Sequence, residues 1–309
     1  MLNLNNRPPS IWRKASIPKK DGSLRHLIIP SDELKKVQRE ILDHLYGCDC
    51  KIHSCVCGFM PEKCAMTGVT RHALDASVIV CVDVHDFFPS FPVSAVKEHL
   101  YMAKLSDTQI RYILSMCTYR TRDRSMIPQG APTSAYLTNI GMFSFDIAVS
   151  GIAKRLGFVY TRYADDLSFS SKDQTIDREH DVKVLLSLVG KELQKMGLRL
   201  AREKTQVIYR NSPKVPRRIT GVTIRKDGKG YNAPIGFRKI TRAKVHDLYN
   251  RLKRGENKDS LRHLYREVLG RVQYCDFCRS ASPDEPFNLG DPKIKKHEWE
   301  FIRKEYSCR

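Results

Sequence analysis

The sequence has few acidic residues for its length and no long apolar run. Its 309 residues include 34 Asp and Glu against 54 Lys and Arg, which gives a net charge of +20. The longest aliphatic stretch, VIVCV at 78–82, is far too short to cross a bilayer. The N-terminal sequence MLNLNNRPPSIWRKASIPKK lacks the continuous apolar segment of a secretion signal. We therefore expect a cytoplasmic protein with no membrane partner.

Cysteine is abundant, but its spacing is not that of a metal site. Five of the ten cysteines lie between Cys48 and Cys64, and Cys275 and Cys278 form a C-x-x-C motif inside a helical apolar pattern. Stable disulfides need an oxidising compartment, and the C-x-C pairs do not have the usual spacing of zinc ligands. We expect reduced, free thiols, with a structural zinc as the alternative.

The purified protein should hold less than about one zinc ion per chain, because the spacing of its cysteines is poor for zinc ligands. Elemental analysis after extensive dialysis measures the metal content. A stoichiometric metal that resists dialysis would contradict the prediction.

The positive charge is concentrated in one part of the chain. Between Arg199 and Arg254 there are 17 basic and three acidic residues, a local net charge of +14. Such a block favours a polyanionic partner, and the strand and turn signals within it favour nucleic acid over a merely solvated face.

Apolar periodicity predicts a single interlocked α+β body with a helical C-terminal part. Two short strands are expected around the Asp21-Gly22 turn, and an apolar strand is expected to end at Asp83. The sequence RYADDLSFS at 162–170 reads as a hairpin with two aspartates at its tip. Further strands are expected within 198–209 and 217–226, and helices at about 32–45, 93–102, 107–117, 134–143, 182–196 and three times in the last 70 residues.

Asp83 and Asp165 each stand at the end of an apolar strand. If these strands pair, the carboxylates converge at one edge of the sheet, with Asp166 beside them. Carboxylates at one point bind Mg²⁺, and two such ions clamp the attacking and leaving oxygens of a phosphoryl displacement. An ordinary solvated turn would also explain an isolated Asp-Asp pair, but not the second apolar strand that ends in Asp83.

Six segments, in order, resemble the motifs of reverse transcriptases. They are IPKKDGSLR (fingers hairpin), DVHDFFPSF (first carboxylate), PQGAPTS (substrate-strand loop), YADD (metal-binding motif), GLRLAREKT (lysine motif) and ITGVTI (primer grip). The resemblance covers about residues 15–225. It implies a right-hand polymerase with fingers at 1–76, an antiparallel palm sheet on helices at 77–235 with finger insertions at about 104–128, and a helical, RNA-binding thumb at 236–309.

The resemblance also implies roles for individual residues. Two Mg²⁺ ions would be held by Asp83, Asp165 and, less directly, Asp166, together with the backbone of Val84, and Lys204 would protonate the leaving group. Phe88 would pack under the sugar and exclude a 2′-hydroxyl, and the other implied nucleotide-binding residues are Lys20, Arg25, Asp86, Phe87, Gln129 and Gly130. Lys19 is an alternative to Lys20. The implied nucleic-acid-binding residues are Arg217, Arg218, Arg225, Lys226, Arg238, Lys239 and Arg242.

Among compact bacterial enzymes, the chain most resembles the retron reverse transcriptases. That resemblance implies a dedicated structured noncoding RNA as template and primer, deoxynucleotides as substrates, RNA-linked cDNA as product, and anti-phage defence with a separate effector or toxin protein. The alternatives are another small group II-intron-like reverse transcriptase (abortive-infection or CRISPR-associated), an RNA-dependent RNA polymerase, and a non-catalytic RNA-binding protein on a polymerase scaffold.

Overall fold

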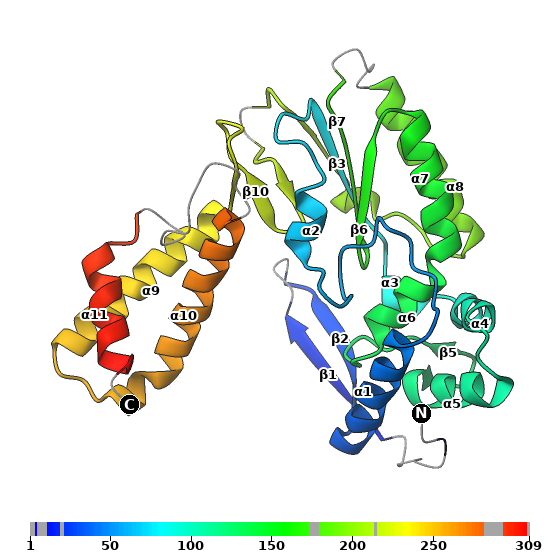
Figure 1. Cartoon of the computed structure of the whole chain (residues 1–309), viewed down its shortest axis with the longest axis horizontal. Helices are drawn as coiled ribbons and strands as arrows, with labels where there is room; N and C mark the ends of the chain where they lie inside the picture. The colour runs from blue at the N-terminus through cyan, green and yellow to red at the C-terminus, as the bar shows by residue number, and fades with distance from the viewer. Residues whose placement is uncertain are drawn as a thin grey trace. The chain divides into compact units, whose positions relative to one another are not determined.

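The protein is represented by a computed structural model that describes residue 4 and residues 11–18, 22–173, 179–212, 215–280 and 293–307. The chain divides into two compact units. The first comprises Met1–Arg71 and Ser77–Val207, and the second comprises His72–Ala76 and Ile208–Arg309. Both contain helices together with antiparallel strands (Figure 1), as the α+β prediction requires. The fingers, palm and thumb boundaries stay a prediction, because compact units follow contacts rather than roles.

The first unit begins with the expected hairpin. Strand β1 (Trp12–Pro18) pairs with β2 (Leu24–Pro30), and Ile17 lies opposite Arg25. The tip of the hairpin, with Lys19, Lys20 and Asp21, lies outside the described residues.

Helix α1 (Asp32–Tyr46) follows the hairpin and starts at a side-chain cap. Ser31 Oγ accepts a hydrogen bond from the Leu34 backbone N–H at 3.2 Å, and acidic residues occupy the first turn. These contacts satisfy backbone donors that have no partner within the helix and complement its dipole. The predicted apolar stripe of α1 is buried.

A four-stranded sheet forms the centre of the first unit. Its order is β6 (Val159–Tyr163), β7 (Asp166–Ser171), β3 (Val78–Asp83) and β8 (Gln206–Tyr209), and β7 is antiparallel to both β6 and β3. Strand β3 is buried along Val78–Val80, which explains its continuous apolar run. The chain passes into the second unit within β8.

Several helices of the first unit pack against this sheet or against one another. Helices α7 (Phe143–Arg155) and α8 (His180–Lys195) lie side by side, and α7 also packs on β6 (Figure 1). Helices α4 (Val93–Met102) and α5 (Asp107–Cys117) have the predicted bounds. The remaining elements are α2 (Ala65–Val69), α3 (Phe87–Ser90), α6 (Ser134–Gly141) and the ladder of β4 (Tyr119–Arg120) and β5 (Ser125–Met126).

One predicted element is wrong in part. The segment 198–209 was expected to be a strand, but Arg202–Lys204 forms a 3₁₀ turn, η1, and only β8 is extended. Three consecutive charged residues, Arg202, Glu203 and Lys204, offer no apolar face to a sheet. The turn instead carries Lys204 toward the end of β3, as its contact with Asp83 shows.

The second unit contains a small sheet and three helices. Strands β9 (Arg218–Ile219), β10 (Val222–Ile224) and β11 (Tyr231–Asn232) are antiparallel, with β10 in the middle. Helices α9 (Ile235–Lys253), α10 (Lys258–Ser280) and α11 (Lys296–Ser307) confirm the three helices expected here. They share an apolar core that includes Leu248, Val268 and Trp299. None of the described helices is long and apolar enough to span a membrane.

Candidate active site

The two apolar strands that end in aspartate are neighbours, as the sequence predicts. Asp83, the last residue of β3, lies opposite Asp166, the first residue of β7. Asp165 occupies the turn before β7, and its carbonyl oxygen accepts a hydrogen bond from the Val84 N–H at 3.2 Å. The register therefore brings all three aspartates to one edge of the sheet.

The turn that carries Asp165 has a constrained backbone. Tyr163 and Asp166 are paired in register, so Ala164 and Asp165 form a two-residue loop, and Ala164 has a φ of +53°. A positive φ is typical of the first position of tight hairpin turns but unfavourable for a residue with a Cβ. A buried guanidinium holds this turn: Arg162 Nη1 donates to the Ala164 carbonyl at 3.2 Å.

The carboxylates interact strongly with one another. Burial and the nearby charge of Asp83 raise the pKa of Asp165, although Lys204 and Arg25 act in the opposite direction. Partial desolvation, together with the negative charges of Asp165 and Asp83, likewise raises the pKa of Asp166. The Asp166 side chain remains in contact with solvent. A cluster in which the ionised form is disfavoured has unsatisfied negative charge, and a cation placed there would relieve it.

Lys204 contacts this cluster directly. Its Nζ lies 3.0 Å from Asp83 Oδ1, and this hydrogen bond raises the pKa of the lysine. The side chain is half exposed, so it can also reach a group that enters from solvent. That Lys204 lies near the leaving group stays a prediction. The structure shows in addition that Lys204 pairs with Asp83.

The aspartates fit a Mg²⁺ site that the substrate completes. Among the described residues, no three His, Cys, Asp or Glu side chains form a ready-made metal cage. Mg²⁺ usually binds through one or two carboxylates together with water and substrate phosphates, not through an all-protein cage. Asp83 and Asp165 would be such ligands, and the raised pKa values of Asp165 and Asp166 have the sign expected of groups that await a cation.

The predicted nucleotide-binding residues lie on several elements of the first unit. Arg25 is on β2 and acts electrostatically on Asp165. The loop at Gln129 is fastened to the same strand, because its carbonyl accepts from the Ile28 N–H at 2.9 Å. Gly130 has a φ of +125°, and a Cβ there would lie 3.2 Å from the Ile28 carbonyl oxygen, so its close backbone approach is to β2.

The segment after Asp83 presents the remaining predicted residues. Asp86 is left-handed (φ +43°) and starts α3, and its carboxylate lies 3.3 Å from His85 Nδ1. Phe87 is buried, whereas Phe88 is half-buried, and their ring centroids are 5.3 Å apart. Phe87 therefore belongs to the core, whereas part of the Phe88 ring is accessible to a ligand. Lys20 lies outside the described residues.

A buried polar network behind the hairpin escaped prediction. Arg162 is fully buried; its Nε and Nη2 donate to the Asp146 carboxylate at 2.8 and 2.7 Å, and its Nη1 donates to Asn139 Oδ1 at 3.0 Å. Tyr160 also donates to Asp146, at 2.9 Å. Burial alone would lower the pKa of Arg162, but the Asp146 carboxylate more than offsets this and raises it. The network fixes the hairpin on α7 and α6.

The cysteine-rich segment lies against the same hairpin. Arg162 donates its N–H to the Cys55 carbonyl, and the Cys57 N–H donates to the Arg162 carbonyl, both at 2.9 Å. Cys55 and Cys57 are buried, and burial raises the pKa of both thiols. These two cysteines therefore act as small apolar side chains beside β6.

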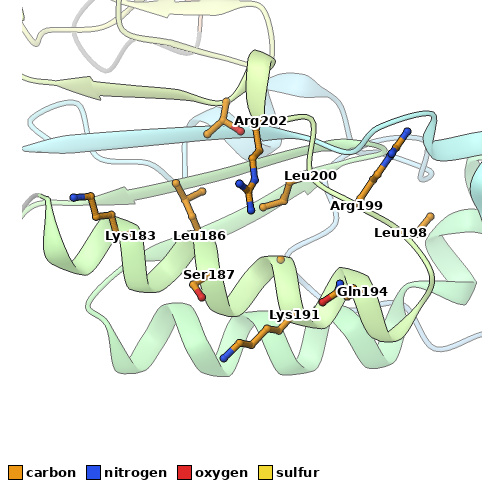
Figure 2. A pocket seen from close by; sticks show the side chains of 11 residues that line it. Lys183, Leu186, Ser187, Lys191, Gln194, Leu198, Arg199, Leu200 and Arg202 are labelled. Carbon is orange, nitrogen blue, oxygen red and sulfur yellow. The ribbon is translucent and has the colours of Figure 1, made fainter.

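The first unit also has a cationic groove apart from the carboxylates. Figure 2 shows it along α8, where Lys183 and Lys191 extend from the helix and Arg199 and Arg202 come from the segment after it. Its volume is about 760 Å³, and none of the three aspartates lines it. The groove is therefore not the candidate active site.

All seven predicted nucleic-acid-binding residues lie in the second unit, and five of them line one cavity. Arg217, Arg218, Arg225, Lys226 and Arg238 line one cavity of about 780 Å³. Lys239 and Arg242 are on α9 and do not line it.

Comparison with known proteins agrees with this geometry. Residues 17–224 match the family described as reverse transcriptase (RNA-dependent DNA polymerase). The chain belongs to the reverse transcriptase family. The match and the mixture of helices and antiparallel sheets confirm the predicted right-hand polymerase fold class.

The relatives of this chain include retron reverse transcriptases. The chain is 33% identical to the retron Mx162 reverse transcriptase of Myxococcus xanthus, over 81% of this chain and 55% of that protein. It is 30% identical to the retron Ec86 reverse transcriptase of Escherichia coli, over 77% of this chain and 70% of that protein. These matches confirm the predicted retron type.

Two comparisons cover only about half of the related protein. The chain spans a little over half the length of the Mx162 relative. A solved structure of truncated apo telomerase from Candida tropicalis has a TM-score of 0.49 and 15% identity, over 72% of this chain and 55% of that chain. The assignment to the family rests on the sequence matches.

Proposed function

We propose that this chain is an RNA-directed DNA polymerase that copies a dedicated structured noncoding RNA into RNA-linked single-stranded DNA. The observation that carries the proposal is the convergence of Asp83, Asp165 and Asp166 at one edge of the β3–β7 pair. Phosphoryl transfer needs little covalent chemistry from the protein, so carboxylates and cations held in place are the main requirement.

The chain's own residues would bind and orient the reactants. Asp83 and Asp165, with Asp166 and the backbone of Val84 in support, would hold two Mg²⁺ ions, which neutralise charge on the attacking and leaving oxygens. Arg25 would pair with triphosphate oxygens through its planar fork. Lys204, a half-exposed cation already at this edge of the sheet, would donate a proton to the pyrophosphate oxygen that departs.

Phe88 provides a test of substrate choice. We predict that Phe88→Ala admits ribonucleotides, because removing the half-buried ring opens space beside the sugar C2′ position. The preference for dGTP over GTP should fall about tenfold or more, since steric exclusion by the ring would be lost. Single-nucleotide incorporation assays with each triphosphate measure this ratio.

Phe277→Ala is the matched control, since this phenylalanine is on α10 in the second unit and is 40% exposed. Its dGTP preference should equal that of the wild type. An unchanged preference in Phe88→Ala would show that sugar selection lies elsewhere.

The proposed template and primer is one structured RNA, and the basic charge of the C-terminal third supports this partner. We expect one abundant short RNA to co-purify with the enzyme from its native host, joined to DNA through a 2′-linkage. Sequencing the bound nucleic acid before and after RNase treatment tests this, because RNase should shorten the product and leave the DNA. A random mixture of cellular RNAs, or DNA without an RNA branch, would favour another group II-intron-like reverse transcriptase.

The proposal includes a place in anti-phage defence with a separate effector protein, which the similarity to retron enzymes supports. Deleting the gene from its native host should then raise phage plaque counts, and restoring the wild-type gene should reverse the change. Equal plaque counts over a broad phage panel would leave a polymerase without this role.

A further inference from the structure

The arginine-lined cavity of the second unit contains buried polar atoms that nothing in the described chain satisfies. Arg217 Nε, Thr223 Oγ1 and Asn232 Oδ1 are each buried without a hydrogen-bond partner among the described residues, and all three residues line this cavity. A buried polar atom without a partner destabilises a folded protein, so its presence there needs an explanation.

The sheet places these atoms together by its register. Thr223, in the middle of β10, pairs with Arg218 on β9 and with Asn232 on β11. Its neighbours Val222 and Ile224 are buried. Because successive side chains of a strand point to opposite faces, the Thr223 side chain lies on the other face of β10. A row of three polar side chains thus crosses the sheet and faces the cavity.

The cavity has a strong excess of positive charge. Six of its lining residues are Arg or Lys, and Asp227 is the acidic one. Asp227 pairs with Arg225 at 2.6 Å, whereas Arg217 Nη2 and Arg210 Nη1 donate to the backbone carbonyls of Ala76 and Asp75. Burial, together with the like charge of Arg210, lowers the pKa of Arg217. The guanidinium groups of Arg210 and Arg217 are therefore oriented by carbonyl oxygens, which carry no full negative charge.

Apolar side chains complete the wall of the cavity. Val215 and Ile235 both line it, yet 44% and 60% of their surfaces are exposed. A flat ring could pack on such aliphatic surface and on guanidinium planes. With a volume of about 780 Å³, the cavity falls in the size range of small-molecule sites.

These features together fit a nucleotide better than a bare phosphate. Arginine, lysine and the Thr223 hydroxyl can donate to a phosphate, but Asn232 Oδ1 is only an acceptor and needs a hydrogen-bond donor, which an ionised phosphate lacks. Base edges supply such donors, and single-stranded RNA can turn an unstacked base into a pocket. Uracil offers one ring N–H and no amine, whereas adenine, cytosine and guanine each carry an exocyclic amine with two N–H donors.

We propose that this cavity binds one unpaired nucleotide of the RNA partner and reads its base through Thr223 and Asn232. The proposal rests on the proposed function only in taking RNA as the partner. It assigns base selection to neutral side chains, while the surrounding cations hold the phosphate. It also predicts a preference for amino-bearing bases over uracil.

The test uses the full-length enzyme and a pool of hairpin RNAs with one fixed stem and a randomised loop. Bound RNAs are separated by filter binding and sequenced. The wild type should enrich one amino-bearing base over uracil at a loop position by about tenfold, the range expected for well-placed base contacts. The double variant Thr223→Val, Asn232→Leu should lose this enrichment and keep the salt dependence of binding, because it removes no charge.

Two controls separate a binding role from a structural one. Ser187→Ala with Gln194→Leu removes two polar groups from the groove of Figure 2 and should keep the enrichment. Replacing unsatisfied polar atoms by apolar ones should leave the urea midpoint of the cavity variant equal to or above the wild-type value. A lower midpoint would instead show that Thr223 and Asn232 stabilise the fold.

The outcomes also separate this inference from the proposed function. DNA synthesis is measured on a generic RNA template with an annealed DNA primer. An active wild type that shows no base preference, or a cavity variant that keeps the preference, would overturn the inference alone. An inactive wild type that still enriches one base would overturn the polymerase and leave the nucleotide site.

Discussion

Asp165→Asn should abolish DNA synthesis and leave the fold and the bound RNA in place. The carboxylate charge is needed to hold the cations that would neutralise the departing pyrophosphate, so the rate should fall by about 10³-fold or more. Primer extension on a generic template measures the loss. The same RNA should still co-purify, now without attached DNA, because the side chain lies at the edge of the sheet and not in the basic cavity.

The same variant should not be less stable than the wild type. Folding raises the pKa of Asp165, so the stability contributed by its protonated form at low pH is lost as the pH rises through the folded-state pKa. Asparagine carries no charge to repel Asp83. At about pH 8 in EDTA, the free energy of unfolding of the variant should therefore equal or exceed that of the wild type.

Two further measurements sharpen this test. Mg²⁺ should raise the melting temperature of the wild type more than that of the variant, because a ligand that binds the native state stabilises it. Asp123→Asn, an exposed aspartate in the β4–β5 turn, should synthesise DNA at the wild-type rate. Synthesis by Asp165→Asn within tenfold of wild type would rule out this aspartate as a metal ligand.

The sequence predicts this edge of the sheet because its signals are local. Val78–Val82 is a continuous apolar run that ends in Asp83, and the strand that follows Asp165 has apolar residues at alternate positions, Leu167 and Phe169. A charged carboxylate at the end of a buried apolar strand is unfavourable for folding, and such exceptions are expected at functional sites. The pairing of the two strands is the one non-local step, and the register confirms it.

The buried polar network behind the active-site hairpin joins residues far apart in the sequence, and the sequence did not predict it. Arg162 interrupts the alternation of its strand, and its partner Asp146 lies on the preceding helix, where it reads as an ordinary polar residue. An arginine within an apolar strand was the available signal. The short segment at Cys55–Cys57 joins β6 through a single bridge, which is too brief to leave a periodic pattern.

Breaking the buried pair should be the largest single effect on stability. Arg162→Met leaves the Asp146 carboxylate buried without its cation and should cost about 3–5 kcal/mol in the free energy of unfolding. Urea denaturation followed by circular dichroism measures it. The exposed pair of Lys183 and Glu179, at 2.7 Å, provides the control, since Lys183→Met should change stability by no more than about 0.5–1 kcal/mol.

The double variant Asp146→Leu, Arg162→Met separates the two roles of the network. With both charges replaced by apolar side chains of similar size, most of the lost stability should return, as it does when a buried ion pair is exchanged for hydrophobic packing. DNA synthesis should not return, because the hydrogen bond from Arg162 Nη1 to the Ala164 carbonyl is still absent. That bond holds the left-handed residue beside Asp165, and a catalytic group displaced by about 1 Å can cost about 10²-fold in rate.

Arg162→Lys provides the complementary case. It keeps a cation for Asp146 but lacks the planar fork that reaches Asp146, Asn139 and the Ala164 carbonyl at once. Its stability should exceed that of Arg162→Met, whereas its turnover should stay low and its KM for deoxynucleotides should stay near the wild-type value. If the double variant recovered both stability and synthesis, the Ala164 turn would not depend on Arg162. The guanidinium would then be a structural group alone.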